Sequence, residues 1–187
     1  MSGKEGQART AFECAAAYML CREREQNGQR FSGWLLVLDM DAYTAGLCSC
    51  DAVGSIALMG DARVDAPSPD SFLEGLERLA GAAARAGFAG QERRTRRVYY
   101  NYLVGERESD LPVYDGVTCS QLEQAFAPAA DAFRQLFPLA EDLLRQKKVA
   151  EDDLRILLVG NMARNYLAEH LARQHFSMDP LLPDPLF

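Results

Sequence analysis

The spacing of apolar residues along the chain predicts four long helices. In these segments apolar residues recur every three or four positions, as expected when one side of a helix packs on a core. The segments are 9–25, 71–87, a long one that begins at Thr118 or Ser120, and a last one that runs from the turn at Gly160 and Asn161 to about His175. Ser120-x-x-Glu123 fits a capping box at the start of the third segment. Pro128 and Pro138 lie inside it and are expected to kink or split it, because proline cannot donate a helical hydrogen bond.

Apolar runs and alternating patterns predict about five strands, at 34–40, 43–50, 53–64, 97–104 and 154–159. The first, WLLVLDM, is apolar nearly throughout, which is typical of a strand buried on both faces. The alternating tyrosines of RVYYNYLV favour the fourth. Short connections indicate antiparallel pairing among the first three strands, whereas the later strands alternate with helices. The order predicts an α/β fold with a mixed sheet, in which antiparallel hairpins come first, strand–helix units follow, and helices pack on the sheet.

The length and composition suit one domain. The chain has 187 residues, of which 48% are hydrophobic, enough for a substantial core. We expect a single domain over 11–176, with a short insert at about 66–96. The two ends, 1–10 and 177–187, are polar or rich in proline and are expected to be flexible or extended.

Charge and cysteine content exclude several function classes. The net charge of −7 argues against nucleic-acid binding, because phosphates would be repelled. No stretch approaches the roughly 20 apolar residues of a membrane helix, and no signal peptide is predicted, so no membrane association is expected. The five cysteines form no C-x-x-C pair, which indicates reduced thiols and a cytoplasmic location. His170 and His175 lack the i, i+4 spacing of a helical metal pair.

Four segments, in this order, carry motifs of one family: FECAAAYML, WLLVLDMDAYTAGLCSC, GVTCSQLEQAF and LRILLVGNMARNYLAEHLARQHF. The first resembles the E-P-T-A-A-A helix in the second lobe of the 70-kilodalton heat-shock chaperones, members of the actin-like ATPase superfamily. The second resembles the phosphate-binding hairpin of that lobe, where a buried strand leads into D-x-G-x-G-T. The third resembles the start of a later helix. The fourth resembles the adenosine motif, where a strand ends in V-G-G-x-x-R before a helix.

The resemblance implies a ribonuclease H-like lobe of the actin-like ATPase type, which binds ATP or ADP with Mg²⁺ against a first lobe. Asp39 would hold the hydrated Mg²⁺, and Thr44 would contact a phosphate. Gly160 and Asn161 would form the turn beneath the ribose and the adenine, and Arg164 would stack on the adenine ring. Hydrolysis would need groups from the first lobe, supplied by a protein partner or by a missing segment.

The sequence departs from the family pattern at the phosphate hairpin. Asp41 and Tyr43 stand where the motif has glycines. A carboxylate at Asp41 would face a phosphate, and two unit charges about 4 Å apart repel by roughly 1 kcal/mol in water and about 4 kcal/mol near a protein surface. Tyr43 adds bulk. In the adenosine motif Gly160 and Arg164 match, whereas Asn161 replaces a glycine.

Three functions stay open on these residues. The first is a chaperone-like lobe that cannot hydrolyse ATP alone and acts through contacts with a protein partner. The second is an ATP- or ADP-binding lobe completed by a partner or a missing segment. The third is an unrelated α/β protein-binding module. Asp39, Asp41 and Arg164 also have structural interpretations, because Asp39 and Asp41 could serve as turn residues and Arg164 could pair with Glu169 or with an acid in a loop.

Overall fold

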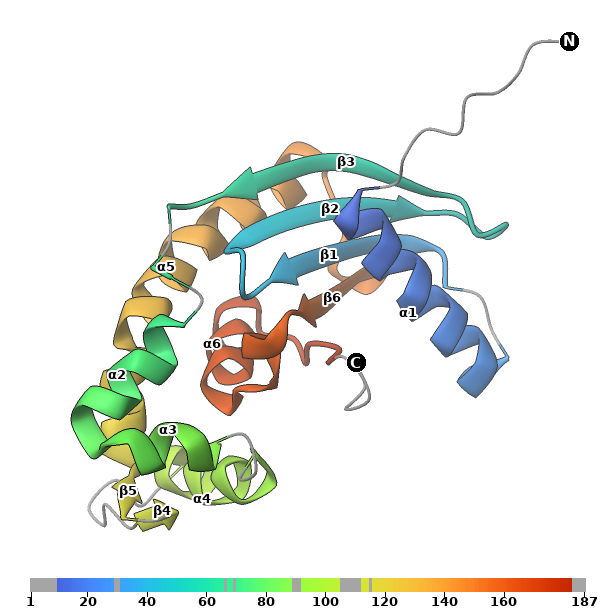
Figure 1. Cartoon of the computed structure of the whole chain (residues 1–187). Helices are drawn as coiled ribbons and strands as arrows, with labels where there is room; N and C mark the ends of the chain where they lie inside the picture. Colours follow the sequence, from blue (N-terminus) through green and yellow to red (C-terminus); the bar gives the residue numbers. More distant parts are fainter. Residues whose placement is uncertain are drawn as a thin grey trace, which may run out of the picture.

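The computed structural model describes residues 10–28, 31–65, 67–68, 70–88, 92–104, 112–114 and 116–182. The helices are α1 (Ala11–Asn27), α2 (Ser71–Ala80), α3 (Ala82–Phe88), α4 (Glu92–Val104), α5 (Cys119–Gln146) and α6 (Tyr166–Phe176), with 3-10 turns η1 (Glu151–Asp153) and η2 (Asn161–Arg164). The strands are β1 (Gly33–Asp39), β2 (Thr44–Cys50), β3 (Ile56–Arg63), β4 (Pro112–Tyr114), β5 (Val117–Thr118) and β6 (Leu154–Val159). Figure 1 shows a curved main sheet and, away from it, a second region made of α2 to α4 and the small β4–β5 hairpin.

The main sheet has four strands in the order β3–β2–β1–β6. β1 pairs antiparallel with β2, and β2 pairs antiparallel with β3, whereas β6 joins β1 in parallel. The predicted α/β fold with a mixed sheet is therefore confirmed. The predicted number of about five strands is wrong, because this sheet has four.

The predicted strand at 97–104 is wrong, because these residues lie in α4. Thr95 and Tyr99 are four positions apart and only 6% and 1% exposed. Tyr102, three positions further, packs edge-to-face on Tyr99, with ring centroids 5.6 Å apart, whereas Tyr100 is 50% exposed. The buried side chains of this segment are therefore spaced three or four positions apart, as in a helix, although the tyrosines also fit the alternation of a strand.

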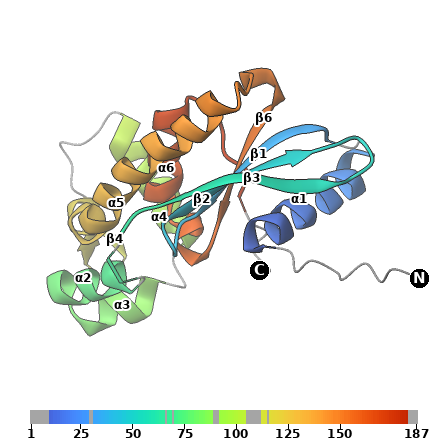
Figure 2. The ribbon, with the colours of Figure 1, turned by 90° about the horizontal axis from the view of Figure 1, so that it is seen from above.

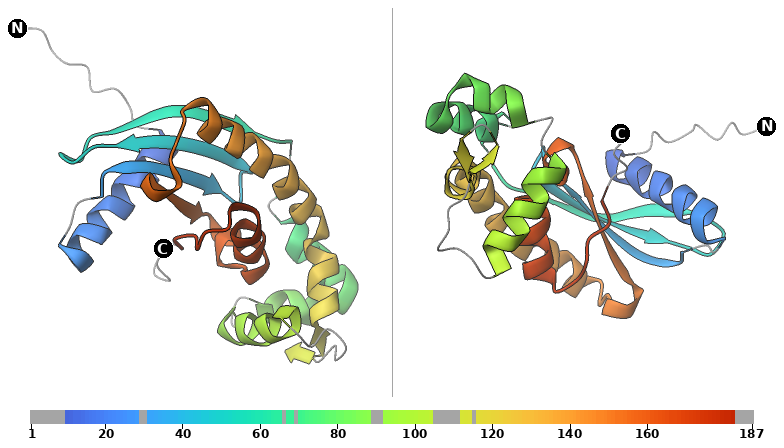
Figure 3. Two further views of the ribbon diagram at one scale, coloured as in Figure 1. Left: turned by 180° about the vertical axis from the view of Figure 1, so that it is seen from behind. Right: turned by 90° about the horizontal axis from the view of Figure 1, so that it is seen from below.

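The two faces of the sheet bury different side chains. Leu36 of β1 belongs to a large core with α5 and α6, whereas the residue before it, Leu35, belongs to a smaller core beneath α1. Figure 1 shows α1 crossing one face, and the view from behind in Figure 3 shows α5 on the other. A Cβ at Gly46 would collide with the Phe12 ring of α1, so this glycine lets α1 lie close to β2.

α5 begins with a capping box made by Thr118 and Gln121. The N–H of Thr118 donates to Gln121 Oε1 at 3.0 Å, and the N–H of Gln121 donates to the Thr118 hydroxyl at 3.4 Å. Thr118, one of the two predicted caps, is therefore confirmed. The predicted box of Ser120 and Glu123 is wrong, and the Glu123 side chain is not engaged in capping.

One predicted helix is continuous where a kink or a break was expected, and another is broken where none was expected. α5 continues for 28 residues through Pro128 and Pro138 and curves along its length, so the prolines bend it and do not split it (Figure 1). The predicted helix at 71–87 is instead divided at Gly81, whose φ of 89° lies outside the helical region, into α2 and α3. Neither α5 nor any other helix within the described residues is long and apolar enough to cross a membrane.

Both edges of the main sheet are shielded. Beside β6, the N–H of Leu181 donates to the Ile156 carbonyl at 2.8 Å, and the N–H of Leu158 donates to the Leu181 carbonyl at 3.0 Å. At the other edge a bulge interrupts the pairing of β2 with β3, and Glu13 Oε1 accepts from the N–H of Leu58 at 3.4 Å. Bulged and covered edges resist pairing with another chain, so β3 is a poor template for an added strand.

Candidate functional site

The two segments that resemble nucleotide motifs meet at one end of the main sheet. β1 and β6 run parallel with Asp39 opposite Val159, so the turn after β1 and the loop after β6 leave the sheet side by side. The N–H of Met40 donates to the Val159 carbonyl at 3.0 Å and ties the two segments together. Figure 2, the view from above, shows β1 and β6 adjacent in the sheet. The fold therefore brings together residues about 120 positions apart in the chain.

Asp41 joins these two segments through its carboxylate. Oδ2 accepts from the N–H of Asn161 at 2.7 Å, and Oδ1 accepts from the N–H of Met162 at 2.8 Å. Both lengths are in the range of strong hydrogen bonds to a charged acceptor. We call this arrangement the Asp41 clamp. It engages the first two backbone donors of η2, which have no partner inside that short turn.

Gly160 is required where the clamp closes. Its φ of 92° and ψ of 167° lie in a region that residues with a Cβ rarely adopt. A Cβ at this position would also stand 2.8 Å from Asp41 Cγ and 3.1 Å from Asp41 N. Because Gly160 has no side chain, the loop after β6 can lie close to the turn between β1 and β2. The Asp41 side chain occupies the space that a Cβ would fill.

Asp39 holds the turn from its own side. Its Oδ1 accepts from the N–H groups of Asp41 at 3.1 Å and Ala42 at 3.0 Å, so the carboxylate caps the turn after β1. Thr44 begins β2 and pairs with Asp39 across the hairpin. Over the described residues, no group of three or more His, Cys, Asp or Glu side chains is arranged to hold a metal ion.

Tyr43 places its side chain in the core, beneath α5. It is 1% exposed and stacks on Phe133, with ring centroids 4.9 Å apart. Its backbone φ is 52°, in the left-handed region that glycine adopts more readily. Burial raises the pKa of Tyr43, and the nearby Asp41 carboxylate raises it further. Within the described chain its buried hydroxyl has no hydrogen-bond partner.

Arg164 ends η2 and does not form the predicted ion pair with Glu169 among the bridges of the described residues. Glu169 is 3% exposed and pairs with Arg96 of α4 at 2.7 Å and with Arg173 at 2.9 Å. Arg96 also lies over the Tyr166 ring, 5.7 Å from its centroid. These ion pairs connect α4 to α6, so Glu169 has a structural role.

The structure therefore assembles most of the predicted site residues, but in a different arrangement. Asp39, Asp41, Gly160 and the backbone of Asn161 lie together at the end of the sheet. Sequence reasoning did not identify Met162, which contributes only a backbone N–H to the clamp. Every residue except proline has a backbone N–H, so the identity of the side chain does not indicate which N–H groups will bind a carboxylate.

Comparison with solved structures yields distant structural likenesses. No family model and no curated protein matches the sequence. Among solved structures, the activator of the 2-hydroxyisocaproyl-CoA dehydratase from Clostridium difficile, with bound ADPNP, is similar with a TM-score of 0.38 and 12% sequence identity. The match covers 89% of this chain and 59% of the activator, so the chain spans about three fifths of the activator's length.

Proposed function

We propose that this chain is a chaperone-like lobe related to the actin-like ATPases, which does not hydrolyse ATP alone and acts in the cytoplasm through contacts with a protein partner. Two features support the relationship. The motif-like segments occur in the family's order, and their turns lie side by side at the end of β1 and β6. Tyr43 adopts a left-handed backbone at a position where the family motif has glycine.

The Asp41 clamp is the observation that most supports the proposed lack of nucleotide chemistry. Its carboxylate uses the N–H groups of Asn161 and Met162, at 2.7 and 2.8 Å. A phosphate approaching this turn would meet a negative charge and would have to displace two hydrogen bonds. The repulsion alone is about 1 to 4 kcal/mol at a separation of roughly 4 Å.

The residues at the turn do not fit a Mg²⁺–nucleotide complex. Asp39 directs Oδ1 to two backbone N–H groups, and Asp41 directs both of its oxygens to the β6 loop. Mg²⁺ in nucleotide sites needs near-octahedral oxygen ligands, several of them water and phosphate. Phosphoryl transfer also needs positioning and charge stabilisation from several sides, so we derive no hydrolytic step from this turn.

Calorimetric titration with ATP and ADP, with and without Mg²⁺, tests this function together with a steady-state ATPase assay. We expect no binding at millimolar nucleotide and no turnover. Micromolar, Mg²⁺-dependent binding by the unaltered chain would contradict the proposal and support the nucleotide-binding alternative.

Asp41→Gly sharpens the test, because it restores the first glycine of the family motif and releases both backbone donors. We expect this variant to gain ADP binding that the unaltered chain lacks. Asp152→Gly is the matched control, because it removes an exposed carboxylate in η1, at the opposite end of β6. Equal nucleotide binding by the two variants would show that the clamp does not exclude the phosphate.

The second candidate is an ATP- or ADP-binding lobe completed by a first lobe from a partner or a missing segment. The left-handed backbone at Tyr43 favours it, because the hairpin already has the local conformation that the glycine motif uses. In this case Thr44, Gly160 and Arg164 would contact the phosphate, the ribose and the adenine. Arg164→Ala would then weaken adenine nucleotide binding, and an unchanged affinity would exclude the stacking role.

A further inference from the structure

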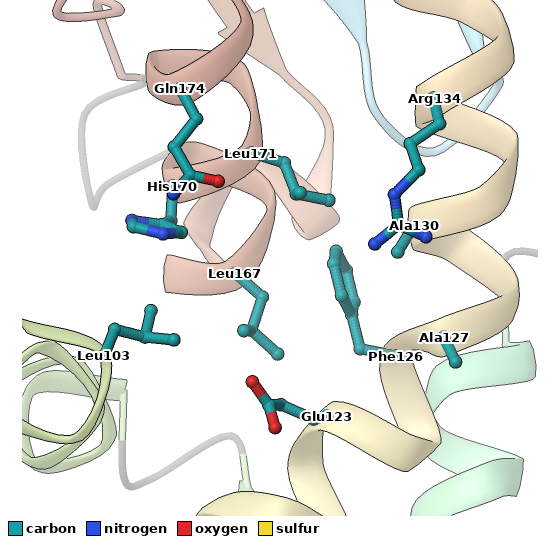
Figure 4. Close-up of a pocket in the computed structure, with 10 residues that line it drawn as sticks. All are labelled: Leu103, Glu123, Phe126, Ala127, Ala130, Arg134, Leu167, His170, Leu171 and Gln174. Atoms are coloured by element: carbon teal, nitrogen blue, oxygen red, sulfur yellow. The ribbon is translucent and has the colours of Figure 1, made fainter. Parts of the chain in front are cut away.

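A half-open cavity of about 250 Å³ lies between α4, α5 and α6. Its apolar walls include Leu103 from α4, Phe126 from α5, and Leu167 and Leu171 from α6, and His170 and Gln174 of α6 add polar groups on one side (Figure 4). Sites for small molecules are typically apolar hollows of about 300 to 1,000 Å³ with a few polar groups. The cavity is slightly smaller than that range and suits one small ligand.

Glu123 places a carboxylate among these apolar walls. Figure 4 shows the carboxylate directed toward Leu167, with Leu103 and Phe126 on either side. The Tyr102 hydroxyl donates to Glu123 Oε2 at 3.5 Å, at the outer limit for a hydrogen bond. No cation forms an ion pair with Glu123 in the part of the chain that the structure describes.

The other polar groups near this carboxylate include a phenol, an imidazole and a guanidinium, from Tyr99, His170 and Arg134. Burial raises the pKa of Tyr99, and the charge of Glu123 raises it further, so this phenol stays neutral at physiological pH. Arg134 also lines the cavity, but it pairs with Asp131 at 2.7 Å. Figure 4 shows Arg134 at the opposite end of the cavity from Glu123. A carboxylate in apolar surroundings is costly unless a cation or several donors approach it.

We propose that this cavity binds a small organic ammonium ion, whose protonated amine donates to Glu123 and whose apolar body packs against Phe126 and Leu167. An ammonium group brings three donors and a positive charge to a carboxylate that has one long hydrogen bond. The apolar walls select a ligand with a hydrocarbon or aromatic body over a hydrated inorganic cation. This site does not depend on the nucleotide chemistry discussed above, and it goes beyond the proposed function.

Phenethylamine is a suitable probe, because it joins a protonated amine to one aromatic ring. Phenethyl alcohol has a similar shape without the charge, and 3-phenylpropionate carries the opposite charge. We expect saturable phenethylamine binding by NMR titration of the full chain, with shifts at α4, α5 and α6. The alcohol should bind about tenfold more weakly, and the carboxylate should not bind. Equal binding of all three would overturn the proposal.

Two variants place the ligand in the cavity. Glu123→Gln removes the charge at nearly constant size and should weaken phenethylamine binding about tenfold while leaving the alcohol unaffected. Ala127→Phe adds a ring from α5 at the cavity wall and should abolish binding of both. Glu151→Gln, an exposed carboxylate in η1, is the control and should change neither. Undiminished phenethylamine binding in Glu123→Gln would overturn the proposal, and because no nucleotide is involved, that outcome leaves the proposed function intact.

Discussion

Two half-buried carboxylates differ in the hydrogen bonds that they accept. Asp41 lies at the end of the main sheet, and Glu123 lies between the helices. Asp41 accepts two backbone N–H groups at 2.7 and 2.8 Å. Glu123 accepts one tyrosine hydroxyl at 3.5 Å among apolar side chains. A predicted ligand residue, Asp41, is therefore engaged in holding the fold, whereas Glu123, predicted to cap a helix, is the residue that we propose to bind a ligand.

Of the changes to the two carboxylates and to Gly160, Asp41→Ala should have the largest effect on stability. It removes two hydrogen bonds to a charged acceptor and leaves two backbone donors of η2 without a protein partner, so we expect a loss of about 2 to 3 kcal/mol. The free energy of unfolding from urea titration measures it. Asp152→Ala, which removes an exposed carboxylate, should cost less than about 0.5 kcal/mol. Equal losses in the two variants would show that the Asp41 clamp does not stabilise the fold.

Gly160→Ala should follow, with a loss of roughly 1 to 3 kcal/mol, because its backbone conformation is strained for alanine. Part of the loss arises from contact with the Asp41 side chain, 2.8 Å from the added Cβ. The double variant Asp41→Ala/Gly160→Ala should therefore lose less than the sum of the single losses. Strict additivity in this double-mutant cycle would mean that the two residues do not act on each other.

Glu123→Gln should change stability by less than about 1 kcal/mol, because its carboxylate has one long hydrogen bond to lose. Thermal and urea denaturation both measure this change. The contrast with Asp41→Ala separates a carboxylate that holds the fold from one that does not. A loss as large as that of Asp41→Ala would show that Glu123 is also structural.

Tyr43→Phe should have the smallest effect, ranging from no change to a gain of about 1 kcal/mol. It keeps the ring that stacks on Phe133 and removes a buried hydroxyl that lacks a hydrogen-bond partner within the described residues. Tyr43→Ala, the matched variant that removes the ring as well, should lose about 3 to 5 kcal/mol. Destabilisation by Tyr43→Phe would reveal a hydrogen bond of the hydroxyl in solution.

Local patterns predicted much of the fold because they act over a few residues. The apolar run of β1 and the helical spacing in α1 were predicted from the sequence, and Thr118 was one of two predicted caps of α5. The prediction at 97–104 was wrong because alternating tyrosines also fit a helical stripe, and only the position of α6 decides which pattern is buried. The division of α2 from α3 at Gly81 depends on one backbone angle, which an apolar spacing does not reveal.

The amino-acid sequence was enough to predict the first helix, the three strands after it, the last strand and helix, and the mixed sheet, and it identified the residues at the end of β1 and β6. What those residues do depends on how the chain packs. Asp41 and Asn161 are 120 positions apart, and the parallel pairing of β1 with β6 is what brings a carboxylate onto backbone donors. The same holds for Glu123, whose surroundings come from three helices. Hydrogen bonding and burial depend on which groups, far apart in the sequence, come into contact. These contacts form only when the chain is folded and packed.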